Sequence, residues 1–262
     1  MISIAKNKEQ WGAYLQKHQS THHSFCWEWK DIIEKSFGHK PYYLIKEGKE
    51  PEGILPCFLV NGALFGKALI SMPYLNSGGI LADNENVKKE FIEYAKELSS
   101  ELGAKYFEFR FDKEEASLKD LKSKTHKVSC ILTLPKDAEE LFKKFKPKLR
   151  SQIRRPTKSG IIAKVTSGNQ IKAKELNGFY SVFSEHMRDL GTPVFPKKLF
   201  ALTLKNFAKD SKLITCWLED KCVAACITVK HGKNVEIPWA SSLRKFNKQS
   251  PNMLMYLSLI HI

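Results

Sequence analysis

The pattern of hydrophobic and polar positions in the first half of the chain predicts two helices, three strands and a third helix. Apolar residues at helical spacing predict helices over residues 8–17 and 26–37, and Gly38 ends the second one. Turn residues then separate three strand-like runs at residues 42–46, 54–60 and 69–74. Gly103 ends the third helix, whose apolar stripe is Val87, Phe91, Ala95, Leu98 and Leu102. Two further strands, at residues 106–111 and 128–134, are expected on either side of a polar helical piece.

The second half of the chain repeats this order. A strand at residues 161–166 precedes a helix whose predicted apolar face comprises Leu176, Tyr180, Phe183, Met187 and Leu190. A helix over residues 196–207 and three strands at 213–218, 222–229 and 235–240 come next. Ser250 and Pro251 then open a last helix as N-cap and first helical residue, because both are favoured there.

Two helices, a meander of three strands and a helix that starts at the last strand form the order of a GNAT-type acyltransferase domain. We therefore predict an α/β (α+β) fold of tandem GNAT-like domains, with mixed and mostly antiparallel sheets flanked by helices. The expected boundaries are 1–136 for the first domain, 137–160 for a basic helical connecting arm and 161–262 for the second domain. The second domain stops in its central helix, so we expect a C-terminally truncated chain whose last few residues are not native.

The charge of the chain is concentrated at the predicted domain junction. The formal net charge is +15, and residues 143–158, KKFKPKLRSQIRRPTK, contain eight basic residues and no acid. Pro147 is placed to start a helix, Gly160 to end it and Pro156 to bend its last turn. Arg150, Arg154 and Lys158 form a cationic stripe, and Lys148 lies nearby. The alternative is a solvated helix face, but like charges at this spacing cost a few tenths of a kcal/mol per pair, roughly, which a bound anion would offset.

The cysteines and the apolar segments exclude other classes of protein. The six cysteines are scattered without CxxC or zinc spacing, so we predict no metal site and buried thiols. The start of the chain has no apolar signal core, and no stretch reaches the roughly 20 apolar residues that a membrane-spanning helix needs. We therefore expect a cytoplasmic protein. Walker, HExxH and GxSxG motifs are absent, and His22-His23 is interpreted as a surface turn.

Three segments carry the candidate chemistry. The strand–loop–helix segment at residues 236–253 offers Trp239, Ser241, Ser242 and Asn252 as substrate contacts, with N–H groups at the helix start for an anion or a carbonyl oxygen. Arg188 and Asp189 are either a helix-end ion pair or substrate contacts. In the loop at residues 72–83, Tyr74, Asn76 and two glycines would let a ligand approach the backbone. Only Glu236 and Asp189 are candidates for a general base. An ordinary strand–loop–helix connection is the alternative for the first segment.

Four stretches together resemble the FemAB family of non-ribosomal aminoacyl and acyl transferases. They are LFGKALISMPYLNSGGILAD at 64–83, PKLRSQIRRPTKSG at 147–160, MRDLGTPVFP at 187–196 and EIPWASSLRKFNKQSPNMLMY at 236–256. The closer likeness is to the FemAB-related branch associated with exosortase (PEP-CTERM) and exopolysaccharide systems, which has a BioF2-like acetyltransferase domain. Members of this branch usually continue with an Asp-x-Gly-Arg-like strand and a Lys/Trp-Gly segment, and both are absent here.

The resemblance implies an enzyme that moves an activated acyl group to an amine acceptor, a peptidoglycan precursor in the cell-wall members. The implied donor is aminoacyl-tRNA or acyl-CoA, and no other cofactor is expected. The Arg/Gln-x-x-Gly-x-Gly/Ala loop of ordinary coenzyme A-dependent GNAT enzymes is absent. The implied partners are an anionic, tRNA-linked or lipid-linked or phosphorylated substrate and the inner face of the membrane, through peripheral contact. The alternatives are a non-catalytic polyanion-binding module and a coenzyme A-dependent acetyltransferase.

Overall fold

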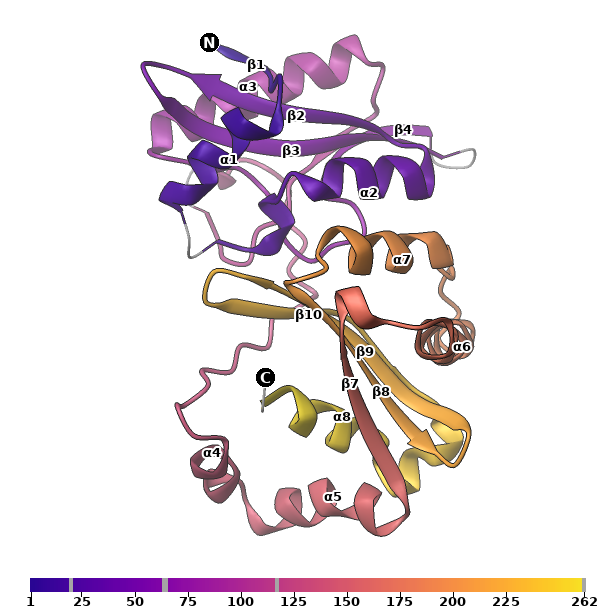
Figure 1. Ribbon diagram of the computed structural model, residues 1–262. Coiled ribbons are helices and arrows are strands. Elements are labelled where there is room, and N and C mark those ends of the chain that lie inside the picture. The colour runs from indigo at the N-terminus through magenta and orange to yellow at the C-terminus, as the bar shows by residue number, and fades with distance from the viewer. Residues whose placement is uncertain (19–20, 63–65, 116–117, 261–262) are drawn as a thin grey trace. The chain divides into compact units, whose positions relative to one another are not determined.

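A computed structural model describes residues 1–18, 21–62, 66–115 and 118–260 of the chain (Figure 1). The chain divides into two compact units. Unit 1 comprises Met1–Ser129 with His231–Asn234, and unit 2 comprises Cys130–Lys230 with Val235–Ile262. Each unit has its own sheet. Two parts of the sequence-based interpretation lie outside the described residues: positions 64 and 65 of the first resembling stretch, and positions 261 and 262, on which the expected truncation partly depends.

Unit 1 is a mixed sheet with helices on both faces. Its strands lie in the order β1-β2-β3-β4-β6, with β5 paired to β3; β4 and β6 are parallel and the other pairs are antiparallel. The elements in chain order are β1 (Ile2–Ile4), α1 (Lys8–Lys17), a 3₁₀ turn (His23–Phe25), α2 (Glu28–Phe37), β2 (Lys40–Glu47), β3 (Pro51–Gly62), β4 (Gly66–Ser71), β5 (Leu81–Ala82), α3 (Glu85–Glu101) and β6 (Phe107–Glu108).

The alternation of side chains along β2 and β3 gives unit 1 two apolar layers. Leu44 and Leu55 face α3, whose predicted stripe is buried at Val87, Phe91, Ala95 and Leu98. On the other face, Tyr43 packs against Trp11 of α1, with 4.6 Å between the ring centroids. Helices of amphipathic pattern therefore cover both faces of the sheet, as the sequence predicts for this half.

Unit 2 is a four-stranded sheet in the order β10-β9-β8-β7, and β7–β8 and β8–β9 are antiparallel. Phe179 and Phe183 of α6 pack against Phe200 of α7, and α5 packs against α8 and β7. The elements are α4 (Ala138–Lys144), α5 (Pro147–Lys158), β7 (Ile161–Ser167), a 3₁₀ turn (Gly168–Gln170), α6 (Ala173–Asp189), α7 (Lys197–Asn206), β8 (Ser211–Leu218), β9 (Lys221–His231), β10 (Asn234–Ser242), a 3₁₀ turn (Arg244–Gln249) and α8 (Pro251–Ile260).

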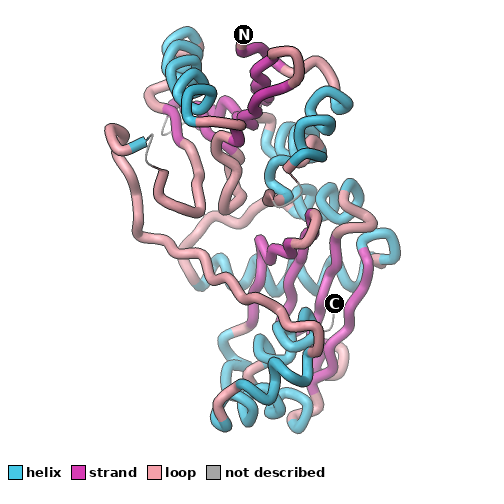
Figure 2. The backbone as a smooth tube through the Cα atoms, turned by 90° about the vertical axis from the view of Figure 1, so that its left-hand side faces the viewer, coloured by secondary structure: helices cyan, strands magenta, loops and turns pink. Residues whose placement is uncertain are grey.

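Three predicted strands differ from the structure, and the one expected at residues 106–111 is reduced to β6. Residues 128–134 form no strand, and every residue from 122 to 134 is exposed; a long loop leads into α4 (Figure 2). The alternating pattern is present, but a strand also needs a neighbour to pair with. The run at 69–74 ends at Ser71 because Met72 and Tyr74 adopt left-handed backbone conformations, with φ values of 45° and 71°.

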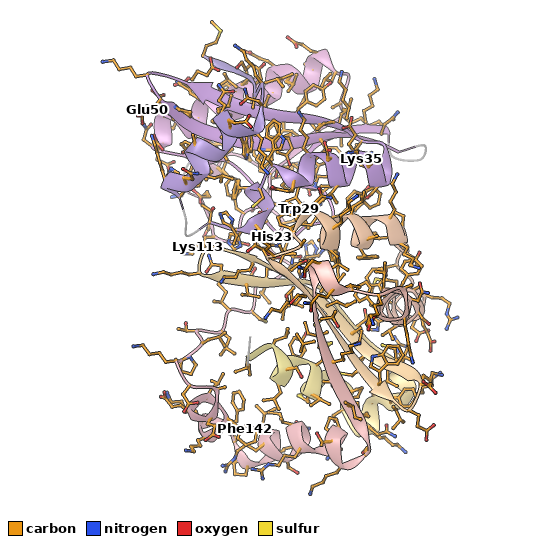
Figure 3. The ribbon with its side chains drawn as sticks, viewed as in Figure 1. His23, Trp29, Lys35, Glu50, Lys113 and Phe142 are labelled. Carbon is orange, nitrogen blue, oxygen red and sulfur yellow. The ribbon has the colours of Figure 1, made fainter. Side chains whose placement is uncertain are left out.

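Three local predictions were also wrong. The buried face of α6 is rotated to Glu175, Phe179, Val182 and Phe183, while Leu190 is exposed. The Glu175 carboxylate accepts from the Lys172 N–H at 3.0 Å and pairs with Lys164, so a charged residue lies on the buried face. His23 is buried against Trp29 instead of lying in a surface turn (Figure 3). Ser250 has φ 55° and ψ 46°, whereas an N-cap residue is usually extended, so it lacks the backbone conformation expected of the predicted N-cap.

Candidate functional site

The cationic stripe predicted from residues 147–160 lies along one face of α5. Arg150, Arg154 and Lys158 line an open groove of about 300 Å³ together with Pro147 and Ser151. On the opposite side of the helix, Ile153 and Pro156 are buried. Lys148 is exposed on α5 but does not line this groove. The helix therefore presents three cations in one row, and each step of four residues advances about 6 Å along the axis.

One of these cations is held by an aromatic ring. The Arg154 guanidinium carbon lies 5.2 Å from the ring centroid of Phe142, which belongs to α4 (Figure 3). Contact between a guanidinium and the face of an aromatic ring is attractive, so Phe142 orients the arginine without neutralising it. The charge of Arg154 remains available to an anion in the groove.

The turn between β10 and α8 is tied to three other elements of unit 2. The Leu243 N–H donates to the Val223 carbonyl of β9 at 3.0 Å, which fixes the end of β10. Arg244 donates through Nη2 to the Asp189 carbonyl at the end of α6, also at 3.0 Å. Arg155 of α5 donates through Nη1 to the Lys248 carbonyl at 3.3 Å. These bonds position the Arg244–Gln249 turn ahead of the first turn of α8.

Two lysines from different elements meet beside this turn. The ammonium groups of Lys221, at the start of β9, and Lys245 lie 5.9 Å and 5.7 Å from the ring centroid of Phe246. A side-chain hydrogen bond with Lys245, together with the charge of Lys245, lowers the pKa of Lys221. Glu185 lies 3.8 Å from Lys245. A cationic cluster therefore lies beside the start of α8, where helix N–H groups also favour an anion or a carbonyl oxygen.

The side-chain alternation of β10 is interrupted near its middle. Ile237 and Ala240 both pack against the core cluster on the α8 side, although an odd number of positions separates them. In an uninterrupted strand they would point to opposite faces. Pro238 lies between them and has no N–H for a sheet ladder. Trp239 packs edge-to-face on Phe200 of α7, with 5.0 Å between the ring centroids, so its ring belongs to the aromatic core.

The other candidates on and beside β10 take different positions. Ser241 is buried, and its hydroxyl has no hydrogen-bond partner among the described residues. Ser242 ends β10 and is half-buried, as is Asn252 in the first turn of α8. Glu236 is half-buried near the start of β10, and the rise of a strand separates its Cα from that of Ser242 by roughly 20 Å. Glu236 therefore lies at the opposite end of β10 from the cationic cluster.

Asp189 and Arg188 form the helix-end pair that the sequence suggested as one alternative. Arg188 Nη2 lies 3.5 Å from the Asp189 carboxylate, and the arginine side chain is largely exposed. The backbone of Asp189 also accepts from Arg244. The structure thus brings this pair to the turn before α8, together with Arg155, Lys221, Arg244 and Lys245, which were not predicted. Only the pairing of β9 with β10 brings Lys221 there, so the local sequence contains no signal for it.

In unit 1, the Met72–Gly79 loop is held closed by Arg110, a residue that sequence reasoning missed. Its Nη1 donates to the Leu75 carbonyl at 2.6 Å, and its own carbonyl accepts from the Gly78 N–H at 3.1 Å. Gly78 has φ 130°, and a Cβ there would lie 2.3 Å from Met72 Cγ. At Gly79, a Cβ would lie 2.7 Å from the Phe111 ring. Both glycines are buried, so they serve the packing of the loop, while Asn76 is exposed at its surface.

Tyr74 carries the polar chemistry of this loop. Its ring stacks on Phe37 with 3.8 Å between centroids, and its hydroxyl lies 2.6 Å from His39 Nε2. Burial raises the pKa of Tyr74 and lowers the pKa of His39. Both shifts favour the neutral forms, so a neutral imidazole and a neutral phenol share this hydrogen bond. This pair can hold or pass a proton at the edge of the loop.

The thiols are not a reactive cluster. Five of the six cysteines are buried and Cys130 is exposed. Burial raises the pKa of Cys216 and of Cys222 to about 12, so neither is a thiolate near neutral pH.

Among the described residues, no group of three or more His, Cys, Asp and Glu side chains is arranged to hold a metal ion. Within the same residues, every helix is too short or too polar to span a bilayer.

Comparison with known proteins supports the fold. Residues 143–261 match the family model described as an acetyltransferase (GNAT) domain. The whole chain matches the crystal structure of FemX at 13% identity with a TM-score of 0.70, covering 100% of this chain and 85% of FemX. It also matches the C-terminal domain (DUF2156) of a protein from Agrobacterium fabrum named for lysylphosphatidylglycerol synthetase. That match has 9% identity and a TM-score of 0.53, and covers 97% of this chain and 74% of the other. No curated protein matches the sequence.

Proposed function

We propose that the protein is a FemAB-type N-acyltransferase, which moves an activated acyl group to an amine acceptor in cell-wall or exopolysaccharide-related biosynthesis. The proposal rests on one observation: the residues that match the GNAT domain and the cationic cluster ahead of α8 lie in the same unit. The FemX-like fold of the whole chain agrees with it.

The expected chemistry is acyl transfer by positioning and charge stabilisation. The acceptor nitrogen attacks the acyl carbonyl, a C–N bond forms, and the ester C–O or thioester C–S bond to the donor breaks. The proton lost by the nitrogen passes to the leaving oxygen or sulfur. N–H groups at the start of α8 would bind the anionic end of the donor, and its acyl carbonyl would lie further along β10, toward Glu236. Holding both reactants in this geometry supplies a large part of the rate enhancement.

Glu236 is the candidate proton acceptor in this scheme. It precedes the interruption of alternation at Pro238, and one of its carboxylate oxygens is buried. A carboxylate at such a place can take the proton from the attacking nitrogen and return it to the leaving group. Asp189 is paired with Arg188 and accepts from Arg244 through its backbone, so it is proposed to shape the cationic turn instead.

A donor competition assay tests the function. The purified protein is given radiolabelled aminoacyl-tRNA or acyl-CoA with a soluble, nucleotide-linked peptidoglycan precursor as the amine. We expect label on the amine from one donor, and a fall in kcat of at least about 100-fold for Glu236→Gln with little change in KM. Glu97→Gln, an exposed change on α3, is the matched control. Transfer from neither donor, with tight tRNA binding, would instead favour a polyanion-binding module.

A further inference from the structure

The segment of residues 128–134, VSCILTL, exposes an unusual density of apolar side chains. Val128, Ile131, Leu132 and Leu134 are 87%, 83%, 55% and 50% exposed. The chain passes from unit 1 to unit 2 within it, after Ser129. Single exposed apolar residues are common in proteins, but a contiguous group usually marks a surface that another body covers. We call these seven residues the apolar segment.

The backbone of the apolar segment restricts what can cover it. The segment has neither helical nor strand structure, so hydration must satisfy its N–H and C=O groups. It therefore cannot lie in the hydrocarbon core of a bilayer, where such groups have no partners. In an extended chain, however, Val128, Leu132 and Leu134 project to one side with Cys130. These side chains can enter a lipid interface while the backbone remains hydrated among the lipid headgroups.

The charge of the residues around the apolar segment indicates what kind of surface can cover it. Residues 119–158 contain thirteen basic and four acidic residues, a net charge of +9 in a chain whose total is +15. Lys122, Lys124, Lys127 and Lys136 flank the apolar segment and are all exposed. A second copy of the chain would bring like charges together. An anionic lipid surface satisfies both the apolar side chains and the lysines, because basic residues gather at negatively charged leaflets.

We propose that the apolar segment docks the protein peripherally on an anionic lipid surface. Leu132 and Leu134 enter the boundary between headgroups and acyl chains, and the flanking lysines contact lipid phosphates. This inference goes beyond the proposed acyl transfer and does not depend on it, since the protein could bind lipid without transferring any acyl group. Interfacial binding of this kind scales with buried apolar area and with attraction to anionic lipids.

The exposed thiol of Cys130 gives a direct measurement. Because the other five cysteines are buried, an environment-sensitive fluorophore can be attached to Cys130 of the otherwise unchanged protein. The protein is then mixed with vesicles of phosphatidylcholine alone or of phosphatidylcholine with phosphatidylglycerol. We expect a blue shift and flotation with the mixed vesicles, both weakened by salt, and neither with phosphatidylcholine alone. Absence of flotation with the mixed vesicles at low salt would overturn the proposal.

Paired variants separate docking from general charge attraction. Leu132→Ser with Leu134→Ser should weaken partitioning into mixed vesicles by at least about tenfold, because the charge is kept and only apolar area is lost. Leu190→Ser removes a leucine of similar exposure, 51%, from the end of α6 and should change nothing. Unchanged partitioning of the double variant would contradict the proposal. The proposal would also be contradicted if the wild type bound no vesicles but formed a concentration-dependent dimer that the double variant lost. That result would assign the apolar segment to contact with a second copy of the chain.

Discussion

At the scale of single residues, the His39–Tyr74 pair makes stability depend on pH. Burial lowers the pKa of His39, whereas an unfolded histidine titrates near 6.5, roughly. Below that value the unfolded chain binds more protons than the folded chain, so stability falls as the pH falls. We expect the urea midpoint of the wild type to decrease between about pH 7.5 and about pH 5.5.

Two variants isolate the contribution of the imidazole. His39→Gln removes the titration and should flatten this part of the pH dependence. Tyr74→Phe keeps the stack on Phe37 but removes the hydroxyl; it should cost about 1 kcal/mol near neutral pH and leave His39 buried. The same slope in His39→Gln as in the wild type would show that other groups cause the pH dependence.

Residue-scale prediction succeeded where the signal is local. The glycines expected to end helices have positive φ: Gly38 at 73°, Gly103 at 64° and Gly160 at 78°. A left-handed residue is needed at such ends, and glycine adopts that conformation at little cost. Arg110 and Lys221, by contrast, reach their sites through the pairing of β4 with β6 and of β9 with β10, and no local pattern encodes those pairings.

At the scale of elements, α5 connects the sequence pattern with anion binding. Arg150, Arg154 and Lys158 share one groove, so a polyanion lying along the helix would meet all three cations. Each phosphate contact contributes about one unit to the slope of log K against log salt. Replacing the three residues with alanine should weaken tRNA binding and reduce that slope by about two to three units. Fluorescence anisotropy over a range of salt concentrations measures it.

The control variant for α5 removes the same number of charges from unit 1. Lys6, Lys49 and Lys89 are exposed and lie in unit 1, outside the basic arm. Their replacement with alanine lowers the net charge equally, so a loss of general attraction should affect both triple variants alike. An equal change of slope in the two variants would refute a specific role for the groove.

Elements were predicted well where one face is strictly apolar. They were predicted less well where a charged residue lies on the buried face or where a segment has no strand to pair with. α1 has the predicted bounds and α3 the predicted stripe. The face of α6 was misassigned because Glu175 is buried with its own partners, and a charged residue normally indicates the solvent side. Residues 128–134 have the alternation of a strand, yet pairing depends on other parts of a protein. Pattern alone therefore predicts the tendency of a segment and not its partner.

At the scale of the whole molecule, the repeated order of elements predicted the α/β fold with GNAT-like sheets, and the FemX match agrees with it. The order sufficed because most consecutive strands here are neighbours in space, which is the commonest arrangement in proteins. The candidate site was less predictable. Its turn is held by bonds from α5, α6 and β9, so the cationic cluster exists only once unit 2 has folded.

The division into two units, each with its own core, leads to a last prediction. Leu44 lies in the core of unit 1 and Leu213 in that of unit 2, and both are fully buried. Leu→Ala at either position should cost about 2–5 kcal/mol, because it removes buried apolar area and leaves a cavity. If each core stabilises mainly its own unit, hydrogen exchange will show that Leu44→Ala lowers amide protection in β2 and β3 far more than in β8 and β9. Leu213→Ala should show the reverse, and equal losses in both sheets would mean that the chain unfolds as one cooperative block.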